Sequence, residues 1–281
     1  MSGQETAGAD APVRGGVGAE RIAAAFARRA ADPSHPTALM PYLMGGYPTP
    51  SVSRELTQAY VDGGADLVEL GVPYSDPLAD GPVIHAAGTT ALEAGVTPAD
   101  VLRIGEQLAA DVPVVLMVYA NLVHHPGFGT FVARLRDAGI SGLIVPDLPI
   151  GEESAEAIAL CDEAGVAFVP LIAPTTSDAR AAEVAREARG FLYAVSVTGT
   201  TGERAALADQ FSEVVSRAKA HATVPVGLGF GIATGEHAAQ AAAAGADGVI
   251  VGSRLVRAAG EPDPVSAVSA VMADLARGLG R

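Results

Sequence analysis

The feature that most constrains the fold of this chain is a repeated alternation of short apolar runs with longer, Ala-rich amphipathic segments. The apolar runs are rich in Val, Ile, Leu and Gly, and such near-continuous hydrophobicity is typical of parallel strands buried on both faces. Eight such runs occur, over residues 38–44, 66–72, 113–120, 142–148, 167–173, 191–196, 225–230 and 248–252.

The segments between the runs carry helix signals. Thr97 places an N-cap hydroxyl before Pro98 at the first helical position, and Asp100 follows at the spacing of a capping box. Glycines such as Gly165 stand where a helix would end, just before the next run. A further helical segment over residues 19–31 precedes the first strand.

Eight strand–helix units in about 240 residues predict an α/β protein, a (β/α)8 TIM barrel with an additional N-terminal helix. A doubly wound open sheet would have a Gly-x-Gly-x-x-Gly turn after its first strand, but residues 44–48 read Met-Gly-Gly-Tyr-Pro. We therefore expect one barrel domain over residues 19–281, with its chemistry at the C-terminal ends of the strands.

Composition excludes several classes of protein. The formal charge of −14 disfavours a nucleic-acid binder, which needs a basic face. Gly, Pro or charge interrupts every apolar run before the ~18–20 residues that span a bilayer. The single cysteine, Cys161, excludes an internal disulfide and fits a reducing cytoplasm. Residues 1–18 lack the apolar stretch of a signal peptide, and we expect them to form a disordered extension.

A carboxylate stands inside the second apolar run. Glu69 lies near the C-terminal end of residues 66–72, and an unpaired buried carboxylate costs several kcal/mol or takes up a proton. Two interpretations remain open at this point. Glu69 either faces outward and pairs with a neighbouring helix, or it faces the barrel mouth as a general acid and base.

The loop that follows favours the second interpretation. Residues 73–82 contain three prolines and are longer than an ordinary strand–helix turn. The loop brings Asp76 and Asp80 over the mouth that Glu69 would line, and paired carboxylates suit a site that gives and takes protons. The alternatives are a turn-forming role for Asp76 before Pro77 and a helix-capping role for Asp80.

Glycine-bearing loops follow three adjacent strands and indicate a phosphate site. They are residues 198–202, 229–232 and 252–253. Barrels bind phosphate through backbone N–H groups after strands seven and eight, where a Cβ would hold the anion away. Arg254 is an additional candidate, and the alternative for the whole set is simple tight turns.

The remaining polar features suggest no second site. His124 and His125 are adjacent, so they cannot share one metal as an i, i+4 pair can, and we expect a solvated loop there. Cys161 is expected to be a packed helix thiol. No cluster has zinc spacing, and no lysine stands at a strand end to form a Schiff base.

Residues 69–82, Glu-Leu-Gly-Val-Pro-Tyr-Ser-Asp-Pro-Leu-Ala-Asp-Gly-Pro, closely resemble the long and specific signature of the tryptophan synthase alpha subunit family. The resemblance runs in order and at family spacing from about Leu39 to Arg257. It includes the segments 119–121, 145–149, 173–176 and 229–232.

This resemblance implies a lyase of tryptophan biosynthesis that cleaves indole-3-glycerol phosphate by a retro-aldol reaction to indole and D-glyceraldehyde 3-phosphate. Glu69 would protonate indole C3 and help to remove the glycerol hydroxyl proton, while an ionised Asp80 would bind the indole N–H. Thr201 would belong to a mobile lid, Tyr193 would lie beside Glu69, and Phe230 would shape the phosphate pocket. The substrate-binding residues carried over are Tyr119, Tyr193, Thr201, Gly202, Phe230, Gly231, Gly252 and Ser253.

The resemblance also implies a partner. A cytoplasmic α2β2 heterotetramer would form with the beta subunit, which would receive the indole and carry pyridoxal phosphate, while this chain would hold neither cofactor nor metal. Residues 73–82 and 121–127 would lie on the contact face.

The chain departs from the commoner family pattern at Tyr47, Tyr74 and Thr200, positions that bear on lid closure and on coupling to the partner. Three alternatives stay open. They are a lyase that releases free indole alone, another phosphate-binding barrel lyase or isomerase, and a non-catalytic subunit that activates a partner.

Overall fold

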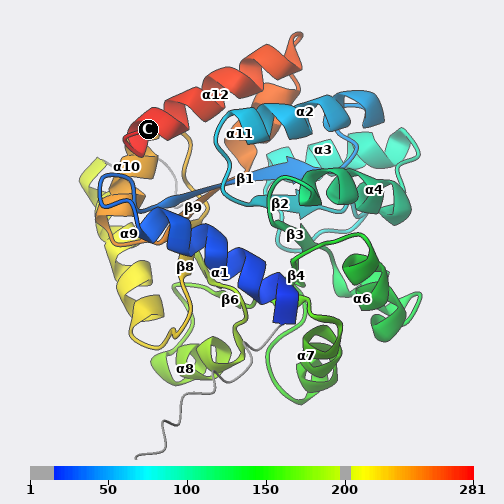
Figure 1. Cartoon of the computed structure of the whole chain (residues 1–281), viewed down its shortest axis with the longest axis horizontal. Coiled ribbons are helices and arrows are strands. Elements are labelled where there is room, and N and C mark those ends of the chain that lie inside the picture. The colour runs from blue at the N-terminus through cyan, green and yellow to red at the C-terminus, as the bar shows by residue number, and fades with distance from the viewer. Residues whose placement is uncertain (1–15, 197–203) are drawn as a thin grey trace, which may run out of the picture.

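The strands form a single parallel sheet. The computed structural model describes residues 16–196 and 204–281, and its strands lie in the order β5-β4-β3-β2-β1-β9-β8-β7-β6 (Figure 1). Their bounds are β1 Ala38–Met44, β2 Val68–Gly71, β3 Val114–Met117, β4 Gly142–Ile144, β5 Ala167–Phe168, β6 Leu171–Ile172, β7 Leu192–Val195, β8 Val226–Gly229 and β9 Gly248–Val251.

Nine strands appear where eight were expected, because the fifth run is interrupted at residues 169–170, where Pro170 lies, and forms both β5 and β6. Proline has no N–H to donate to a ladder. The segment still joins both edges of the sheet, since Val169 N donates to Leu143 O (2.9 Å) and Tyr193 N donates to Pro170 O (3.1 Å). The sheet is thereby closed, which confirms the predicted (β/α)8 barrel.

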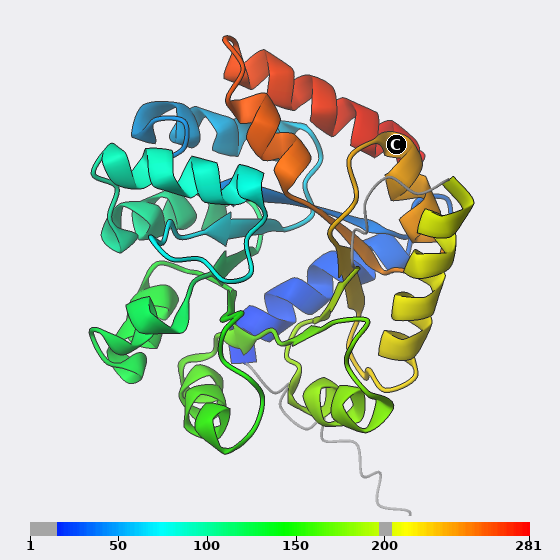
Figure 2. The same cartoon turned by 180° about the vertical axis from the view of Figure 1, so that it is seen from behind.

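Helices surround the sheet on its outer face (Figures 1 and 2). They bury an apolar layer against the strands that includes Tyr60, Leu70, Phe168 and Phe211. The helices are α1 Gly16–Ala30, α2 Pro50–Asp62, α3 Pro82–Glu93, α4 Pro98–Ala109, α5 Ala120–His124, α6 Phe128–Asp137, α7 Glu152–Ala164, α8 Asp178–Glu187, α9 Arg204–Lys219, α10 Gly235–Ala243, α11 Ser253–Ala259 and α12 Pro264–Gly278.

Helix α1 crosses the N-terminal ends of the strands, in front of the sheet in Figure 1 and behind it in Figure 2. Its Ile22 and Phe26 are buried with Met40 and Phe191 inside the barrel. The Phe26 and Phe191 ring centroids are 5.9 Å apart. Helix α1 therefore packs the floor of the barrel.

The prediction of a disordered extension over residues 1–18 is wrong for the last three of these residues, because α1 begins at Gly16. Gly18 N donates to Gly165 O (2.8 Å), and a Cβ at Gly18 would overlap the backbone oxygen of Ser141. Glycine is needed here for close backbone approach, rather than for flexibility. Residues 1–15 lie outside the described part of the chain.

A buried carboxylate ties three segments together at this floor. Asp66 is 5% exposed and accepts from Arg29 Nε (2.6 Å) and from Arg281 of the C-terminus (2.7 Å). It also accepts from Leu39 N at the start of β1 (2.8 Å). Asp66 thus joins the first helix and Arg281 by ion pairs and the first strand by a hydrogen bond.

Candidate active site

A cavity of about 370 Å³ opens at the C-terminal ends of the strands. Residues of the barrel interior, of the loop after β2 and of the turns after β8 and β9 line it together. They are Tyr42, Glu69, Asp80, Gly81, Pro82, Val83, Ile84, Met117, Tyr193, Phe230, Gly231, Ile232, Ala233, Ile250, Gly252, Ser253, Arg254 and Arg257.

Glu69 faces this cavity from β2. It stands in register with Tyr42 of β1 and Val115 of β3, is 3% exposed, and contributes to the cavity lining. Its Oε2 atom is buried with no hydrogen-bond partner among the described residues. Burial, and secondarily the Asp80 charge, raises the pKa of Glu69 to about 8. The outward-facing interpretation is wrong, and the carboxyl holds a proton at neutral pH.

Asp80 reaches the same cavity from the loop after β2. Burial raises the pKa of Asp80, while a hydrogen bond with Tyr119 and the charge of His85 act in the opposite direction. Gly81, not Asp80, is the N-cap of α3, so the helix-capping alternative is wrong. The loop therefore presents Asp80 to the site as a partly buried acid opposite Glu69.

Tyr119 holds that loop in place from the end of β3. Its hydroxyl accepts a hydrogen bond from Ala79 N (3.0 Å), and its ring stacks on Tyr74 with centroids 5.0 Å apart. Asn121 Nδ2 in turn donates to the Tyr74 hydroxyl (3.1 Å). Tyr119 is not among the residues that line the cavity, so in this structure it contacts the Asp80 loop rather than the open space.

Asp76 lies apart from the site. It is exposed, accepts a hydrogen bond from the Ser75 hydroxyl (2.5 Å) and does not line the cavity. This geometry agrees with the turn-forming alternative that the sequence left open.

Two tyrosines form the inner wall beside Glu69, and the absence of side chains at two glycines makes room for them. A Cβ at Gly71 would overlap the Tyr42 hydroxyl, and one at Gly229 would overlap the Tyr193 hydroxyl. Burial raises the pKa of both tyrosines well above the ordinary value, with the Glu69 charge adding to the effect. Both tyrosines therefore stay neutral beside the carboxyl.

Sequence analysis found Tyr193 but missed Tyr42. A signal was present in β1, where Met40, Tyr42 and Met44 alternate with Leu39 and Leu43. Met40, Tyr42 and Met44 pack inside the barrel, whereas Leu39 and Leu43 pack against the outer helices, because successive side chains of a strand point to opposite faces.

The glycine turns after β8 and β9 meet at one side of the cavity. Phe230 and Gly231 adopt left-handed φ values of 72° and 78°. The Ser196 hydroxyl donates to Phe230 O (2.7 Å), which holds this turn, and Gly252 forms the N-cap of α11. Gly231, Gly252 and Ser253 all line the cavity. The expected contacts from Thr201 and Gly202, like Thr200, lie outside the described residues.

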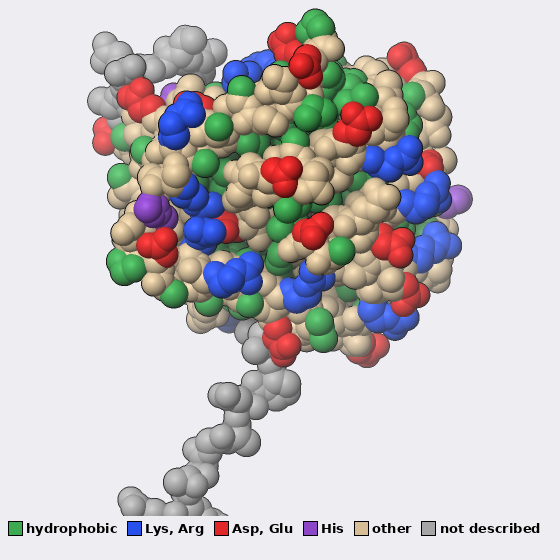
Figure 3. Space-filling view, turned by 45° about the horizontal axis from the view of Figure 1, so that its top comes forward, with side chains coloured by type: hydrophobic (Ala, Val, Ile, Leu, Met, Phe, Trp, Pro, Cys, Tyr) green, Lys and Arg blue, Asp and Glu red, His purple; other side chains and the backbone are tan. Residues whose placement is uncertain are grey.

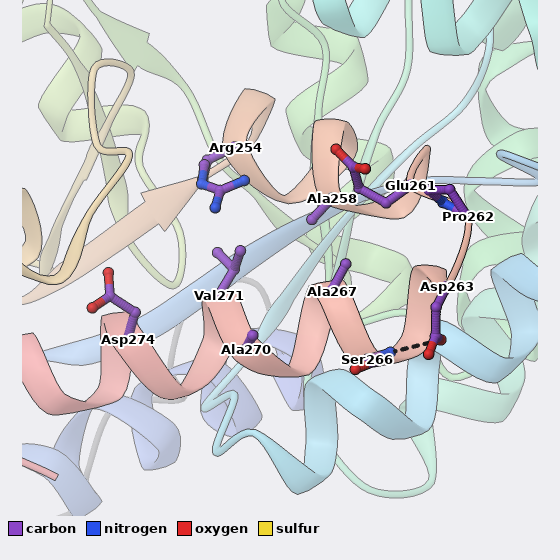
Figure 4. A pocket seen from close by; sticks show the side chains of 10 residues that line it. All are labelled: Arg254, Ala258, Glu261, Pro262, Asp263, Ser266, Ala267, Ala270, Val271 and Asp274. Carbon is purple, nitrogen blue, oxygen red and sulfur yellow. Dashed lines mark hydrogen bonds between the residues drawn. The ribbon is translucent and has the colours of Figure 1, made fainter.

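A larger hollow of about 630 Å³ lies between α11 and α12 (Figure 4). Its lining includes the small side chains of Ala258, Ala267 and Ala270. Asp263, which also lines it, is the N-cap of α12 and accepts a hydrogen bond from Ser266 N (3.2 Å). Arg254 is the one lining residue that it shares with the cavity around Glu69. The acid–base chemistry therefore belongs to the smaller cavity.

The other predicted features carry no chemistry here. Cys161 is fully buried, and burial raises the pKa of its thiol to about 12. His124 and His125 are exposed at the end of α5 rather than in a loop. Within residues 16–196 and 204–281, no cluster of three His, Cys, Asp or Glu side chains could hold a metal. Acidic and basic side chains are interspersed over the face seen in Figure 3.

Comparison with known proteins identifies the family. Residues 29–276 match the family model described as "Tryptophan synthase alpha chain". The chain belongs to the tryptophan synthase alpha chain family. It is therefore a lyase of tryptophan biosynthesis, as the signature over residues 69–82 had indicated.

Individual alpha chains support this assignment. The alpha chain of Methanosarcina acetivorans is 46% identical over 220 residues, which cover 78% of this chain and 80% of the relative. That of Synechocystis is 42% identical over 236 residues, covering 83% and 89%. A crystal structure of tryptophan synthase from M. tuberculosis, in an open form with BRD0059 bound, superposes with a TM-score of 0.83 at 36% identity and covers 92% of this chain and 98% of its own.

Over the residues that the structure describes, the helices of the alpha chain are all too short or too polar to cross a bilayer.

Proposed function

We propose that Glu69 and Asp80 carry out the cleavage of indole-3-glycerol phosphate in this alpha chain. The observation that supports this most directly is the buried Glu69 carboxyl, which faces the same cavity as Asp80 and has a pKa raised to about 8, and whose Oε2 atom has no hydrogen-bond partner among the described residues. A carboxyl that is protonated at neutral pH and has an oxygen without such a partner is available to a substrate.

Glu69 gives its proton to indole C3, which turns the ring into an indolenine cation. The carboxylate that results then removes the proton from the hydroxyl on the carbon attached to C3. The electron pair of that O–H bond forms the aldehyde, and the C3–carbon bond breaks with its electron pair returning to the ring. Indole and D-glyceraldehyde 3-phosphate leave, and Glu69 is again protonated.

Asp80 stabilises the positive charge that C3 protonation creates on the indole nitrogen. An ionised carboxylate that accepts the indole N–H does this best, since charge-assisted hydrogen bonds are the strong ones. Both carboxyl pKa values are raised here, whereas the family resemblance implied that Asp80 is ionised. The Tyr119 hydrogen bond and the His85 charge are the features that favour the ionised form of Asp80.

The phosphate end of the substrate binds at Gly231, Gly252 and Ser253. These residues line the cavity on the side of α11, away from the β2 strand that carries Glu69. Their backbone N–H groups suit an anion because a glycine places no Cβ between amide and phosphate. Thr201 and Gly202, outside the described residues, are proposed as further contacts on the strength of the family resemblance.

The alpha chain needs no cofactor for this reaction, and pyridoxal phosphate belongs to the beta subunit. The sequence contains a single lysine, Lys219, which pairs with Asp247 (2.8 Å) beside the start of β8. That is the opposite end of the barrel from Glu69, so a Schiff base to this lysine plays no part at the mouth.

Membership in the family implies a beta-subunit partner, and we propose an α2β2 heterotetramer in the cytoplasm. Leu78, at the tip of the loop over residues 73–82, is 87% exposed and apolar. An exposed leucine of this kind suits a partner surface, and it lies only two residues from Asp80, so docking can act on the site.

Indole release from indole-3-glycerol phosphate, with and without a beta subunit, tests the proposal. We expect slow release from the alpha chain alone and a sharp rise with the partner. Fast release from the alpha chain alone would support a stand-alone lyase instead. No release under either condition would leave only a phosphate-binding barrel of other function or a non-catalytic activator.

A further inference from the structure

Two arginines form the cationic part of the cavity wall. Arg254 and Arg257 both line the cavity around Glu69, and its other ionisable acids and bases are Glu69 and Asp80. Neither arginine side chain makes a hydrogen bond or an ion pair with another residue that the structure describes. Both are exposed at the rim rather than buried.

Their spacing directs both side chains to the same place. Residues three apart on a helix share a face, and helical side chains lean toward the N-terminus of their helix. For α11 that end is Gly252 and Ser253, the turn where the phosphate is proposed to bind. Arg254 starts in the first turn, and Arg257 reaches back from the second.

The charge balance of the cavity favours a cation there. A phosphate monoester brings close to two negative charges into a space that already holds two carboxyl groups, in a chain of net charge −14. Backbone amides contribute only partial charges. A guanidinium contributes a full charge and can bind two phosphate oxygens at once.

From these observations we infer that Arg254 and Arg257 bind the phosphate of the substrate through their guanidinium groups, in addition to the backbone amides. This inference rests on the proposed function of the cavity. Figure 4 shows Arg254 extending from α11 toward α12, above Val271. To contact the phosphate, its guanidinium would therefore have to rotate about the side-chain bonds of Arg254. Arg257 lines the catalytic cavity alone and needs no such movement.

The test compares Arg254→Gln, Arg257→Gln and the double variant with wild type. Arg28→Gln is the matched control, because Arg28 is an exposed arginine on α1 at the opposite end of the barrel. Calorimetric binding of glycerol 3-phosphate is measured at two salt concentrations, followed by KM and kcat for indole-3-glycerol phosphate. We expect the double variant to bind about tenfold more weakly, with a flatter salt dependence and a raised KM at nearly unchanged kcat.

The outcomes separate this inference from the proposed function. Binding of glycerol 3-phosphate by the double variant within about twofold of wild type would overturn the role of the arginines, whatever the activity. A loss equal to that of Arg28→Gln would do the same, because it would reflect net charge alone. If wild type released no indole, the lyase proposal would fail, while the binding series would still decide whether the arginines hold a phosphate.

Discussion

At the scale of single residues, the protonation state of Glu69 connects stability with activity. Its pKa is raised from an ordinary value of 4.5 to about 8 by burial. Between these values the folded chain binds one more proton than the unfolded chain, so the free energy of unfolding falls as pH rises. The slope is at most about 1.4 kcal/mol per pH unit, and it ends near pH 8.

Glu69→Gln is expected to lower indole release by a factor of about 100 or more, since a general acid contributes roughly 10²–10⁴ in rate. The same change removes the buried ionisation. The variant should therefore gain thermal stability over wild type as pH rises from 5 to about 8, as followed by melting temperature.

Glu106→Gln, at an exposed position of α4, is the control for both measurements. Glu69→Gln activity within about tenfold of wild type, or a melting difference independent of pH, would contradict the role assigned to Glu69.

Whether the role of a single residue could be predicted depends on whether its neighbours in the sequence or its contacts in the fold determine that role. Glu69 is visible in the sequence because a carboxylate interrupts an apolar run. Its pKa is not, because burial and the approach of Asp80 decide it. Asp76 and Asp80 share one loop, and their surroundings differ through contacts with residues distant in the sequence, such as the Tyr119 hydroxyl, 40 residues beyond Ala79. The need for glycine at position 18 could not be predicted either, because its hydrogen-bond partner Gly165 lies far along the chain.

At the scale of elements, the loop between β2 and α3 depends on the end of β3. Tyr119 holds Ala79 N and hydrogen-bonds Asp80, so the catalytic loop is positioned by a neighbouring strand end. The sequence showed both segments but not their contact. The split of β5 from β6 lies at Pro170, but β1 runs unbroken through Pro41, so a proline within a run did not by itself predict the split.

Tyr119→Phe should lower kcat about tenfold while lowering the free energy of unfolding by about 1–3 kcal/mol, the typical worth of the two hydrogen bonds that its hydroxyl makes with Ala79 N and with Asp80. In wild type the hydrogen bond from Tyr119 lowers the pKa of Asp80. Its loss should raise that pKa, so the acid limb of the pH–rate profile should move to higher pH. Steady-state kinetics across pH measure both effects.

Tyr74→Phe removes only the hydroxyl that accepts from Asn121 on the exposed side of the same stack, and it should behave almost as wild type. Equal effects from the two substitutions would show that ring stacking, rather than the Tyr119 hydroxyl, holds the loop.

At the scale of the whole molecule, the floor network joins the two ends of the described chain to the barrel. Asp66→Asn leaves Arg29 and Arg281 facing a neutral side chain while keeping its shape. We expect a loss of about 2 kcal/mol, because both arginines keep some contact with water and the full cost of a broken buried pair does not apply. Chemical denaturation measures this loss.

The surface pair of Arg136 with Asp137 supplies the comparison, since the Asp137 side chain is 67% exposed. Asp137→Asn should change the free energy of unfolding by less than about 0.5 kcal/mol. A similar small change for Asp66→Asn would mean that apolar packing alone fixes α1 and the C-terminus.

The packed floor also determines how molecules pass through the barrel. With Ile22 and Phe26 of α1 filling the space beneath the strands, the cavity around Glu69 is a cup that opens toward the mouth. One substrate enters by that route, and cleavage then leaves two molecules to share the way out. Whatever covers the mouth therefore governs not only when substrate enters but also the order in which the two products depart.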